Sequence, residues 1–496
     1  MPYLALYLLA LSSVVVMAPG ATVYWDAFGY VLQAINGDVG GLGLGRPVFA
    51  MATHALARAW LALGGSPWNV EILLRVACAI AASAAAPLTM RLALDCGASR
   101  RAAWMAGLAV AVSPAAAHAS GQVLTDGPGA ALLVLACVCG VRATVTTRRS
   151  TALGLGAGVV LGLAVGVREQ TLLNAVTLAW FVWLAPRPER WRLGLAMAAG
   201  FVAALTLPLV FVLLTQPAYV ATVRAWIVNM TRDRMVKTYG WRDLAVYLAW
   251  LLSLGPVVVI AGGLGIAATI RSRRWRWPLL TAMAAPALLQ VAWLATFRGV
   301  GYSPRLLIGA LPVAFAIPAA VAVTEWAGNS VGRWRMALAG WILPLLLAAP
   351  VAHFQSAELT ATLRDWPSRL RALPADAVVV TGQPCPAIPL VRAIVTLDSG
   401  AALLDGPALS PSNLRTLETP RSAWEPVCPG WAWPSNLEER LNRALGERHV
   451  VAADLRGSSW TGAEQRAARD ELERYVRAHP IAEISGQLIV WRDEPR

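Results

Sequence analysis

The chain has 496 residues, of which 57% are hydrophobic and 14% charged, and its mean hydropathy is +0.55. A soluble protein of this length needs more polar side chains to cover its surface, so the composition excludes an ordinary soluble protein and indicates a multi-pass membrane protein. The formal net charge of +14 would suggest nucleic-acid binding only if the basic residues gathered on one soluble face.

The arginines stand instead between the apolar runs. The basic clusters are Arg100 and Arg101; Arg142, Arg148 and Arg149; Arg187, Arg190 and Arg192; Arg271, Arg273, Arg274 and Arg276; and Arg333 and Arg335. Because basic loops stay in the cytoplasm, these loops are expected inside and the alternate loops outside the cell. The charge therefore indicates topology, and no nucleic-acid partner is expected.

Eleven apolar segments are predicted to span the cell (inner) membrane, with the N terminus in the cytoplasm. They run near residues 3–18, 70–94, 102–118, 128–146, 151–167, 170–185, 193–214, 244–270, 278–297, 305–324 and 335–351. Several fall short of the roughly 20 residues that a span usually needs, so the pair at 151–185 is also compatible with a shallow hairpin. The fold class predicted for residues 1–352 is therefore an α-helical multi-pass membrane domain.

Residues 19–69 are predicted to form one long external loop. The segment 46–65 within it is apolar enough to be counted as a span. That reading would turn every arginine cluster outward and place Arg58 in the middle of the membrane, at a cost of about 2.5–3.5 kcal/mol on insertion scales. The segment is better interpreted as an interfacial helix on the outer surface.

Composition changes near His353, where the apolar runs stop. Residues 353–496 are predicted to form a small extracytoplasmic α/β domain. Its strand-like runs are 377–381, 393–397, 449–455 and 486–491. Cys385 and Cys428 lie in this region, where an oxidising compartment favours a disulfide between them, the alternative being two separate thiols.

Four glycines recur every fourth residue along the segment 151–167. They are Gly154, Gly158, Gly162 and Gly166. This spacing puts them on one face of a helix, and it predicts close packing against a neighbouring helix.

Two acidic residues on the outer side are candidates for chemistry. Asp26 and Asp126 stand at corresponding places, just after an outward-going helix or just before an inward-going one, so both are expected to face a shared external cavity. Each also has a structural explanation as the cap of a following helix, with Pro128 in the early turn after Asp126. The aromatic residues Tyr24, Trp25, Phe28 and Tyr30 surround Asp26, and such rings suit sugar faces and lipid boundaries equally well.

Two arginines are placed to meet an anion on the same side. Arg168 lies between two apolar runs, and its neighbour Glu169 is an awkward partner because adjacent side chains on a helix diverge. Arg305 occupies a similar depth at the outer start of a later helix, three residues after Tyr302. Guanidinium groups bind phosphate through paired donors, so the arginines suit a phosphate-bearing lipid; the alternative is interfacial snorkelling.

These residues and motifs, in order, resemble the GT-C superfamily of membrane glycosyltransferases. The resemblance rests on an outer-loop aspartate after the first helix, followed by "GRPVFAMATHAL", "SGQVLTDGPGAALLVLA", "GLAVGVREQTLL" and "YSPRLLIGALP". It covers about residues 1–350 and is greatest to the branch of the protein O-mannosyltransferases and lipid A aminoarabinose transferases.

The resemblance implies an enzyme that moves a sugar from a polyprenyl-phosphate donor to an acceptor hydroxyl outside the membrane. Asp26 would be the general base of an inverting transfer, and Arg168 and Arg305 would bind the donor phosphate. The substrate-binding residues would be Asp126, Tyr24, Trp25, Tyr30, Glu169, Tyr302 and His54. The acceptor would be a lipid, a polysaccharide or a protein.

The sequence departs from the mannosyltransferase pattern at one point. Those enzymes commonly pair two acids at the loop site, whereas here Ala27 follows Asp26, and no Asp-x-Asp triplet is present there. No cofactor is therefore expected to be required, and a divalent metal is possible but not favoured.

Two other classes of protein remain open from the sequence. A lipid or small-molecule transporter or flippase would explain the helices and charges without chemistry, although the charges gather at one surface and not near the midplane. A noncatalytic envelope assembly protein is favoured if the C-terminal domain alone binds a partner.

Overall fold

The structure is a computed structural model of the full chain. It describes residues 1–18, 25–37, 39, 46–145, 149–217, 219–221, 223–224, 251–271, 278, 280–281, 283–289, 307–371, 378–381, 450–454, 473–474, 476–478 and 487–491. The chain divides into two compact units. Unit 1 comprises Met1–Ala18, Asp38–Ala52 and Leu74–Ala352, and unit 2 comprises Pro19–Gly37, Thr53–Leu73 and His353–Arg496. The division into domains at residues 352 and 353 stays a prediction.

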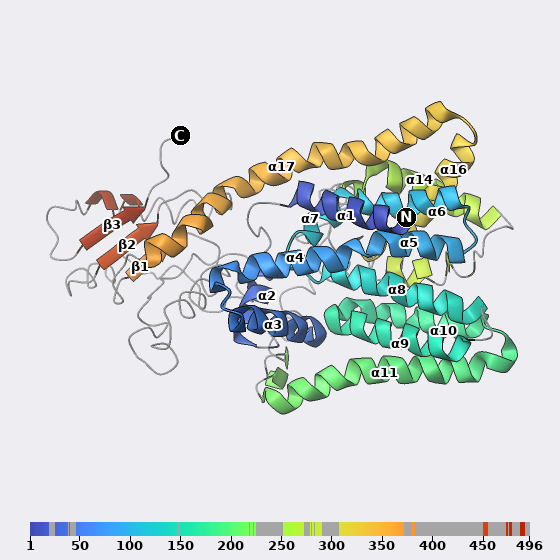
Figure 1. Ribbon diagram of the computed structural model, residues 1–496, viewed down its shortest axis with the longest axis horizontal. Helices are drawn as coiled ribbons and strands as arrows, with labels where there is room; N and C mark the ends of the chain where they lie inside the picture. Colours follow the sequence, from blue (N-terminus) through green and yellow to red (C-terminus); the bar gives the residue numbers. More distant parts are fainter. Residues whose placement is uncertain are drawn as a thin grey trace, which may run out of the picture. The chain divides into compact units, whose positions relative to one another are not determined.

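Helices make up most of the described elements (Figure 1). In chain order they are α1 (Pro2–Met17), α2 (Trp25–Asn36), α3 (Pro47–Ala62), η1 (Pro67–Asn69), α4 (Val70–Ser83), α5 (Ala85–Asp95), α6 (Arg100–Ala111), α7 (Pro114–Ser120), α8 (Asp126–Val145), α9 (Ser150–Val167), η2 (Glu169–Asn174), α10 (Ala175–Leu184), η3 (Arg187–Glu189), α11 (Arg190–Thr215), α14 (Pro256–Arg271), η5 (Leu311–Ala316), α16 (Ile317–Ala327) and α17 (Val331–Arg371). The three strands are β1 (Val378–Thr381), β2 (Val450–Asp454) and β3 (Gln487–Trp491).

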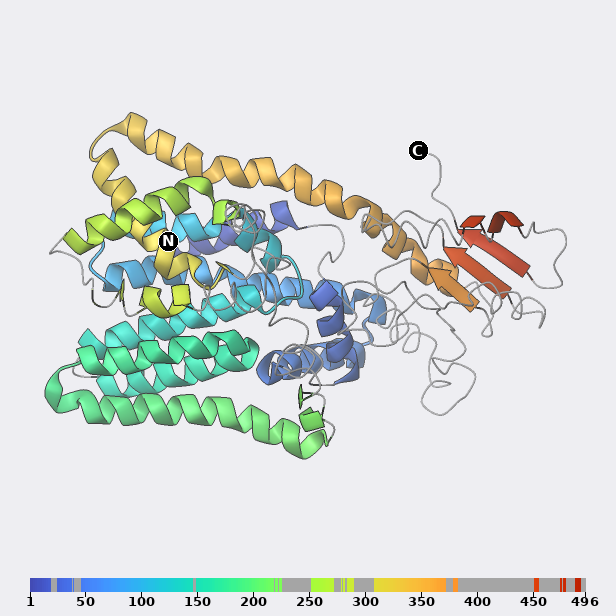
Figure 2. The ribbon, with the colours of Figure 1, turned by 180° about the vertical axis from the view of Figure 1, so that it is seen from behind.

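Two groups of packed helices form unit 1. In one group, α9 packs between α8 and α11, and α10 lies beside them (Figures 1 and 2). In the other, α6 packs against α1, α5 and α16, and α14 packs against α16. Helix α5 also packs against α8, so it joins the two groups.

Several of these helices are long and apolar enough to cross a membrane. Among the described residues the spans are Pro67–Asp95, Asp126–Val145, Ser150–Val167, Arg190–Thr215 and Val331–His353, with a sixth if the bent pair α6 and α7 counts as one span. Shorter apolar helices are Pro2–Met17, Pro256–Ile266 and Leu311–Ala327. The count of eleven stays a prediction. At 170–185, one expected span, the chain forms the 3₁₀ turn η2 and the ten-residue α10.

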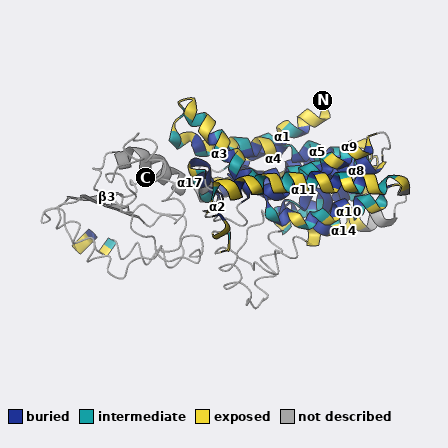
Figure 3. Ribbon diagram, turned by 90° about the horizontal axis from the view of Figure 1, so that it is seen from below, coloured by how far each residue is buried: buried dark blue, intermediate teal, exposed yellow. Residues whose placement is uncertain are grey.

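Helix α11 shows how little of a lipid-facing helix is buried. Its large apolar side chains Trp191, Leu195, Leu207 and Leu214 are exposed, and Figure 3 shows exposed residues all along the helix. Apolar side chains in such numbers would be unfavourable in water but are suited to lipid.

The glycine stripe on α9 packs as the sequence predicts. A Cβ at Gly158 would collide with the backbone carbonyl of Met197 in α11, and one at Gly162 would lie 2.7 Å from the Phe201 carbonyl oxygen. Only glycine lets the two backbones approach so closely. The prediction of close helix packing is therefore confirmed.

In unit 2, the strands form a three-stranded parallel sheet in the order β1-β2-β3. These strands match three of the four predicted runs, and the fourth, 393–397, lies outside the described residues. Parallel neighbours require long crossover connections, which is why the strands are far apart in the chain. The small C-terminal α/β domain stays a prediction as a whole.

Candidate functional site

A buried ion pair joins the start of α8 to the end of α9. The Arg168 Nη1 lies 2.6 Å from the Asp126 Oδ1, and the two side chains are only 4% and 5% exposed. The sequence analysis placed both residues in the site but in separate roles. The structure brings them together, and it shows that Arg168 pairs with Asp126 and not with its neighbour Glu169.

Local sequence explains why the two side chains meet. Helix α8 begins at Asp126, where a carboxylate in the first turn is favoured by the helix dipole and Pro128 fits without losing a hydrogen bond. Helix α9 ends at Val167, and Arg168 follows it in an extended conformation. Because α8 and α9 follow each other closely in the chain and pack together, the first residue of one and the residue after the other lie at the same end of the pair.

A second ion pair continues the network. The Arg46 Nε lies 2.8 Å from the Glu169 Oε2, and its Nη2 donates to the Oε1 at 3.3 Å. Gln170 connects the two pairs, since its Nε2 donates to Glu169 at 2.9 Å and its Oε1 accepts from the Arg168 Nε at 3.2 Å. The five side chains contain two positive and two negative charges. Sequence reasoning missed Arg46 and Gln170.

The opposite end of α8 carries a separate set of charges. Asp95, at the end of α5, accepts from Arg142 Nε at 3.0 Å and from Arg91 Nη2 at 2.8 Å. At about 1.5 Å per residue, the 20 residues of α8 span about 30 Å, the thickness of a bilayer core. Charged clusters at both ends of an apolar helix are the arrangement expected of a membrane span.

The predicted base, Asp26, belongs to unit 2 and lies in the first turn of α2. Ala27, Tyr30, Val31 and Ala34 are buried, and their spacing gives this helix one apolar face. Tyr30 is 1% exposed, and its role in binding substrate stays a prediction.

His54 also has a structural contact in unit 2. Its Nδ1 lies 2.7 Å from the carbonyl oxygen of Ala34 and donates a hydrogen bond to it. Gly37 follows with a φ of +80°, and a Cβ there would lie 2.9 Å from the His54 ring. His54 therefore ties α3 to the end of α2.

The remaining predicted site residues lie outside the part of the chain that the structure describes. They are Tyr24, Tyr302, Arg305, Cys385 and Cys428, together with the side chains of Trp25 and Asp26. Within the described residues, no three His, Cys, Asp or Glu side chains gather closely enough to hold a metal ion.

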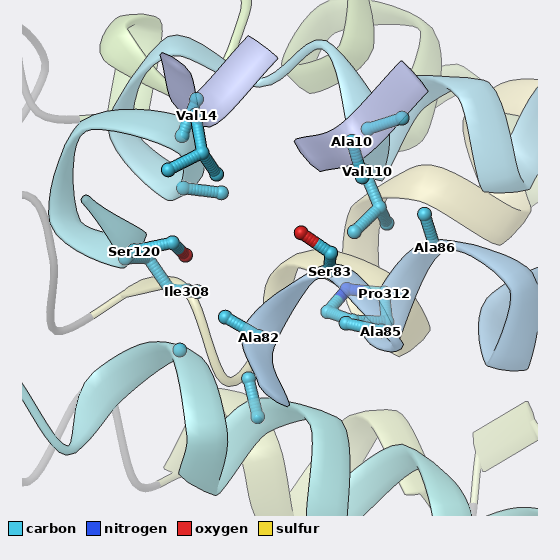
Figure 4. Close-up of a pocket in the computed structure, with 15 residues that line it drawn as sticks. Ala10, Val14, Ala82, Ser83, Ala85, Ala86, Val110, Ser120, Ile308 and Pro312 are labelled. Carbon is cyan, nitrogen blue, oxygen red and sulfur yellow. The ribbon is translucent and has the colours of Figure 1, made fainter. Parts of the chain in front are cut away.

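A small cavity in unit 1 is lined mostly by alanines. It encloses about 30 Å³ between α1, the α4–α5 junction, the bend between α6 and α7, and the start of η5 (Figure 4). Ser83 and Ser120 are its polar side chains, and the Ser83 hydroxyl donates to the Ala79 carbonyl at 2.7 Å. A space of this size holds about one water molecule and no sugar or lipid.

The comparisons with known proteins give one family match over part of the chain and matches to solved structures. The sequence profile of the dolichyl-phosphate-mannose-protein mannosyltransferase family matches residues 64–229. The comparison with curated protein sequences gives no match. Among solved structures, ArnT from Cupriavidus metallidurans bound to undecaprenyl phosphate superposes with a TM-score of 0.52 at 14% identity, covering 99% of this chain and 88% of ArnT.

Two further solved structures match. ArnT in the apo state gives a TM-score of 0.50 at 14% identity, covering 98% of this chain and 85% of ArnT. The apo oligosaccharyltransferase from Archaeoglobus fulgidus gives 0.48 at 13% identity, with 79% of this chain covering 63% of that longer protein. The chain thus shares the fold of ArnT and, over residues 64–229, the sequence pattern of the mannosyltransferases, which confirms its resemblance to the GT-C membrane glycosyltransferases.

Proposed function

We propose that this chain is an integral membrane glycosyltransferase that moves a sugar from a polyprenyl-phosphate donor to an acceptor hydroxyl on the outer side of the cell membrane. The observation that supports this most is the buried Arg168–Asp126 pair, in a fold shared with a protein whose solved structure holds undecaprenyl phosphate. An arginine held by a carboxylate is already desolvated and oriented, so a lipid phosphate gains charge-assisted hydrogen bonds with little reorganisation.

The reaction is an inverting displacement at the anomeric carbon. Asp26 accepts the proton of the acceptor hydroxyl while its oxygen bonds to the anomeric carbon, and the bond to the lipid phosphate breaks. Arg168 and Arg305 stabilise the negative charge that develops on the leaving phosphate. Asp126 orients Arg168 in this scheme. Glu169 holds the side chain of Gln170, which in turn accepts a hydrogen bond from Arg168.

The proposed reaction requires no cofactor, and a divalent metal is possible but not favoured. The lone acid at position 26, followed by Ala27, provides one carboxylate where a metal needs several ligands. The basic clusters support an N terminus in the cytoplasm and residues 353–496 outside, on the side where the acceptor is met.

The test is a strain that lacks this protein, complemented with wild type, Asp26→Asn, Arg168→Ala or the control Glu71→Gln. Envelope glycans and polyprenyl-phosphate sugars are measured in each. We expect a glycan to be missing and a donor to accumulate in the deletion, Asp26→Asn and Arg168→Ala strains, with rescue by wild type and Glu71→Gln. Full rescue by Asp26→Asn would refute the assigned base and favour a transporter or an assembly protein.

A further inference from the structure

Arg46 and Glu169 form a nearly buried ion pair, and the reaction scheme gives Arg46 no role. Both nitrogens of the fork face the two carboxylate oxygens, at 2.8 and 3.3 Å, and the side chains are 10% and 12% exposed. A two-pronged pair of this kind fixes the orientation of both partners as well as their distance. The partners are 123 residues apart in the chain, so the pair joins the first external loop to the turn after α9.

The same stretch of the loop is held at a second place. The Val39 N–H donates to the side-chain oxygen of Gln216 at 2.8 Å, just after α11. Val39 and Ala50 also form a buried apolar cluster with Val212 and Tyr219. Residue 39 and residues 46–52 are therefore fixed against η2 and the end of α11, all within unit 1.

The backbone of Arg46 adopts a conformation that residues with a Cβ rarely adopt. Its φ of 45° lies in the left-handed region, which is unfavourable for every residue with a Cβ except in special contexts. Gly45 stands immediately before it, and glycine would adopt this conformation without strain. Strain of this kind persists where the surrounding structure holds it, and the two-pronged pair with Glu169 is one contact that holds Arg46 in place.

We infer that Arg46 is a positioning residue that couples phosphate binding at Arg168 to the order of residues 46–52. The connection runs from Arg46 to Glu169, then to Gln170, whose Oε1 accepts from the Arg168 Nε. This inference rests on the proposed function, because it takes the phosphate at Arg168 from there. A phosphate that binds the Arg168 guanidinium changes the hydrogen bond between Arg168 and Gln170. Because Gln170 also bonds to Glu169, this change is passed on to Arg46 and the residues that follow it.

Linkage makes the coupling reciprocal. If the pair between Arg46 and Glu169 strengthens phosphate binding, then bound phosphate must protect residues 46–52 to the same extent. Glu169 also acts on the apolar cluster, since burial and, to a smaller degree, the charge of Glu169 raise the pKa of Tyr219.

The experiment uses the purified full chain and undecaprenyl phosphate, and it has two readouts. The first is hydrogen exchange of the amides of residues 47–52, and the second is the dissociation constant of undecaprenyl phosphate. The variants are Arg46→Gln, Arg46→Lys and the exchanged pair Arg46→Glu with Glu169→Arg. Arg142→Gln is the matched control, because it breaks an arginine–carboxylate pair with Asp95 at the other end of α8.

Arg46→Gln is expected to raise the dissociation constant about tenfold, within the usual range of coupling, and to speed the exchange of residues 47–52. Undecaprenyl phosphate should slow this exchange in the wild type and not in Arg46→Gln. Arg46→Lys, which keeps the charge and loses the fork, should fall between the two, and the exchanged pair should recover part of the loss. Arg142→Gln should behave as wild type in both readouts.

If hydrogen exchange of residues 47–52 is unchanged in Arg46→Gln, Arg46 does not hold this stretch in place. If exchange becomes faster while undecaprenyl phosphate binds as in the wild type, the coupling to phosphate binding is refuted. A wild-type chain that does not bind undecaprenyl phosphate would refute the proposed function and the coupling with it. Hydrogen exchange in Arg46→Gln would still show whether Arg46 holds residues 47–52 in place. If Arg46→Gln does not fold, Arg46→Lys is judged by the same two criteria.

Discussion

Replacing Asp126 by asparagine is expected to destabilise unit 1, because the Arg168 guanidinium then stays buried beside a neutral amide. The pair is 2.6 Å long with both side chains at most 5% exposed. At an effective dielectric constant of about 20, two charges at this distance attract by about 6 kcal/mol. Part of this attraction offsets the free energy lost when the two charges are removed from water. Removing one partner of a buried pair costs about 3–5 kcal/mol of stability.

The assay is a double-mutant cycle in detergent micelles, with unfolding followed by the fluorescence of the 22 tryptophans. Asp126→Asn and Arg168→Gln are each expected to lower the unfolding free energy by about 3–5 kcal/mol. The double variant should lose less than the sum of the two, by about 2 kcal/mol or more, because neither charge is then left alone. Glu325→Gln, at an exposed carboxylate, is the control. Single variants within about 0.5 kcal/mol of the wild type would refute the reasoning.

Three further predictions concern other parts of the chain. Gly158→Ala should lower the unfolding free energy by about 1–3 kcal/mol in the same assay, because the new Cβ would meet the Met197 carbonyl in α11. The control Gly156→Ala has open space around it and should cost nothing. Equal stabilities of the two variants would contradict the packing of α9 on α11. Burial and the charge of Glu169 raise the pKa of Tyr219, so the stability that this tyrosine contributes is fully present below pH about 10 and is lost as the pH rises through its folded pKa. Tyr219→Phe should therefore flatten the alkaline part of the curve of stability against pH, and an unchanged curve would argue against it. Cys385 and Cys428 should resist thiol alkylation until the unfolded protein is reduced, as detected by mass spectrometry, and alkylation of both without reductant would exclude the disulfide.

Local signals in the sequence were sufficient for elements whose cause is local. The start of α8 at Asp126 agrees with an acidic residue and a proline in its first turn, and the glycine stripe of α9 follows from its spacing. The structure of residues 170–185 was harder to predict. Composition shows that this segment is apolar, but it does not show that the segment begins with a 3₁₀ turn.

The partners of the charged residues could not be predicted in the same way. The sequence indicates that Arg168 and Glu169 diverge, but their partners Asp126 and Arg46 lie 42 and 123 residues away in the chain. Helix periodicity carries no information about such distant pairs. One signal for Arg46 was present: an arginine at the polar edge of an apolar segment, directly after a glycine-rich run and before Pro47.

The order of strands in unit 2 has a consequence for biogenesis. Strand β2 is the centre of the sheet and pairs with β3, which is the last strand along the chain. The sheet is therefore completed only after Trp491 has been synthesised, long after the helices of unit 1 have left the ribosome. Because the sheet needs this late strand, closure of long loops and not helix insertion should limit how fast it forms.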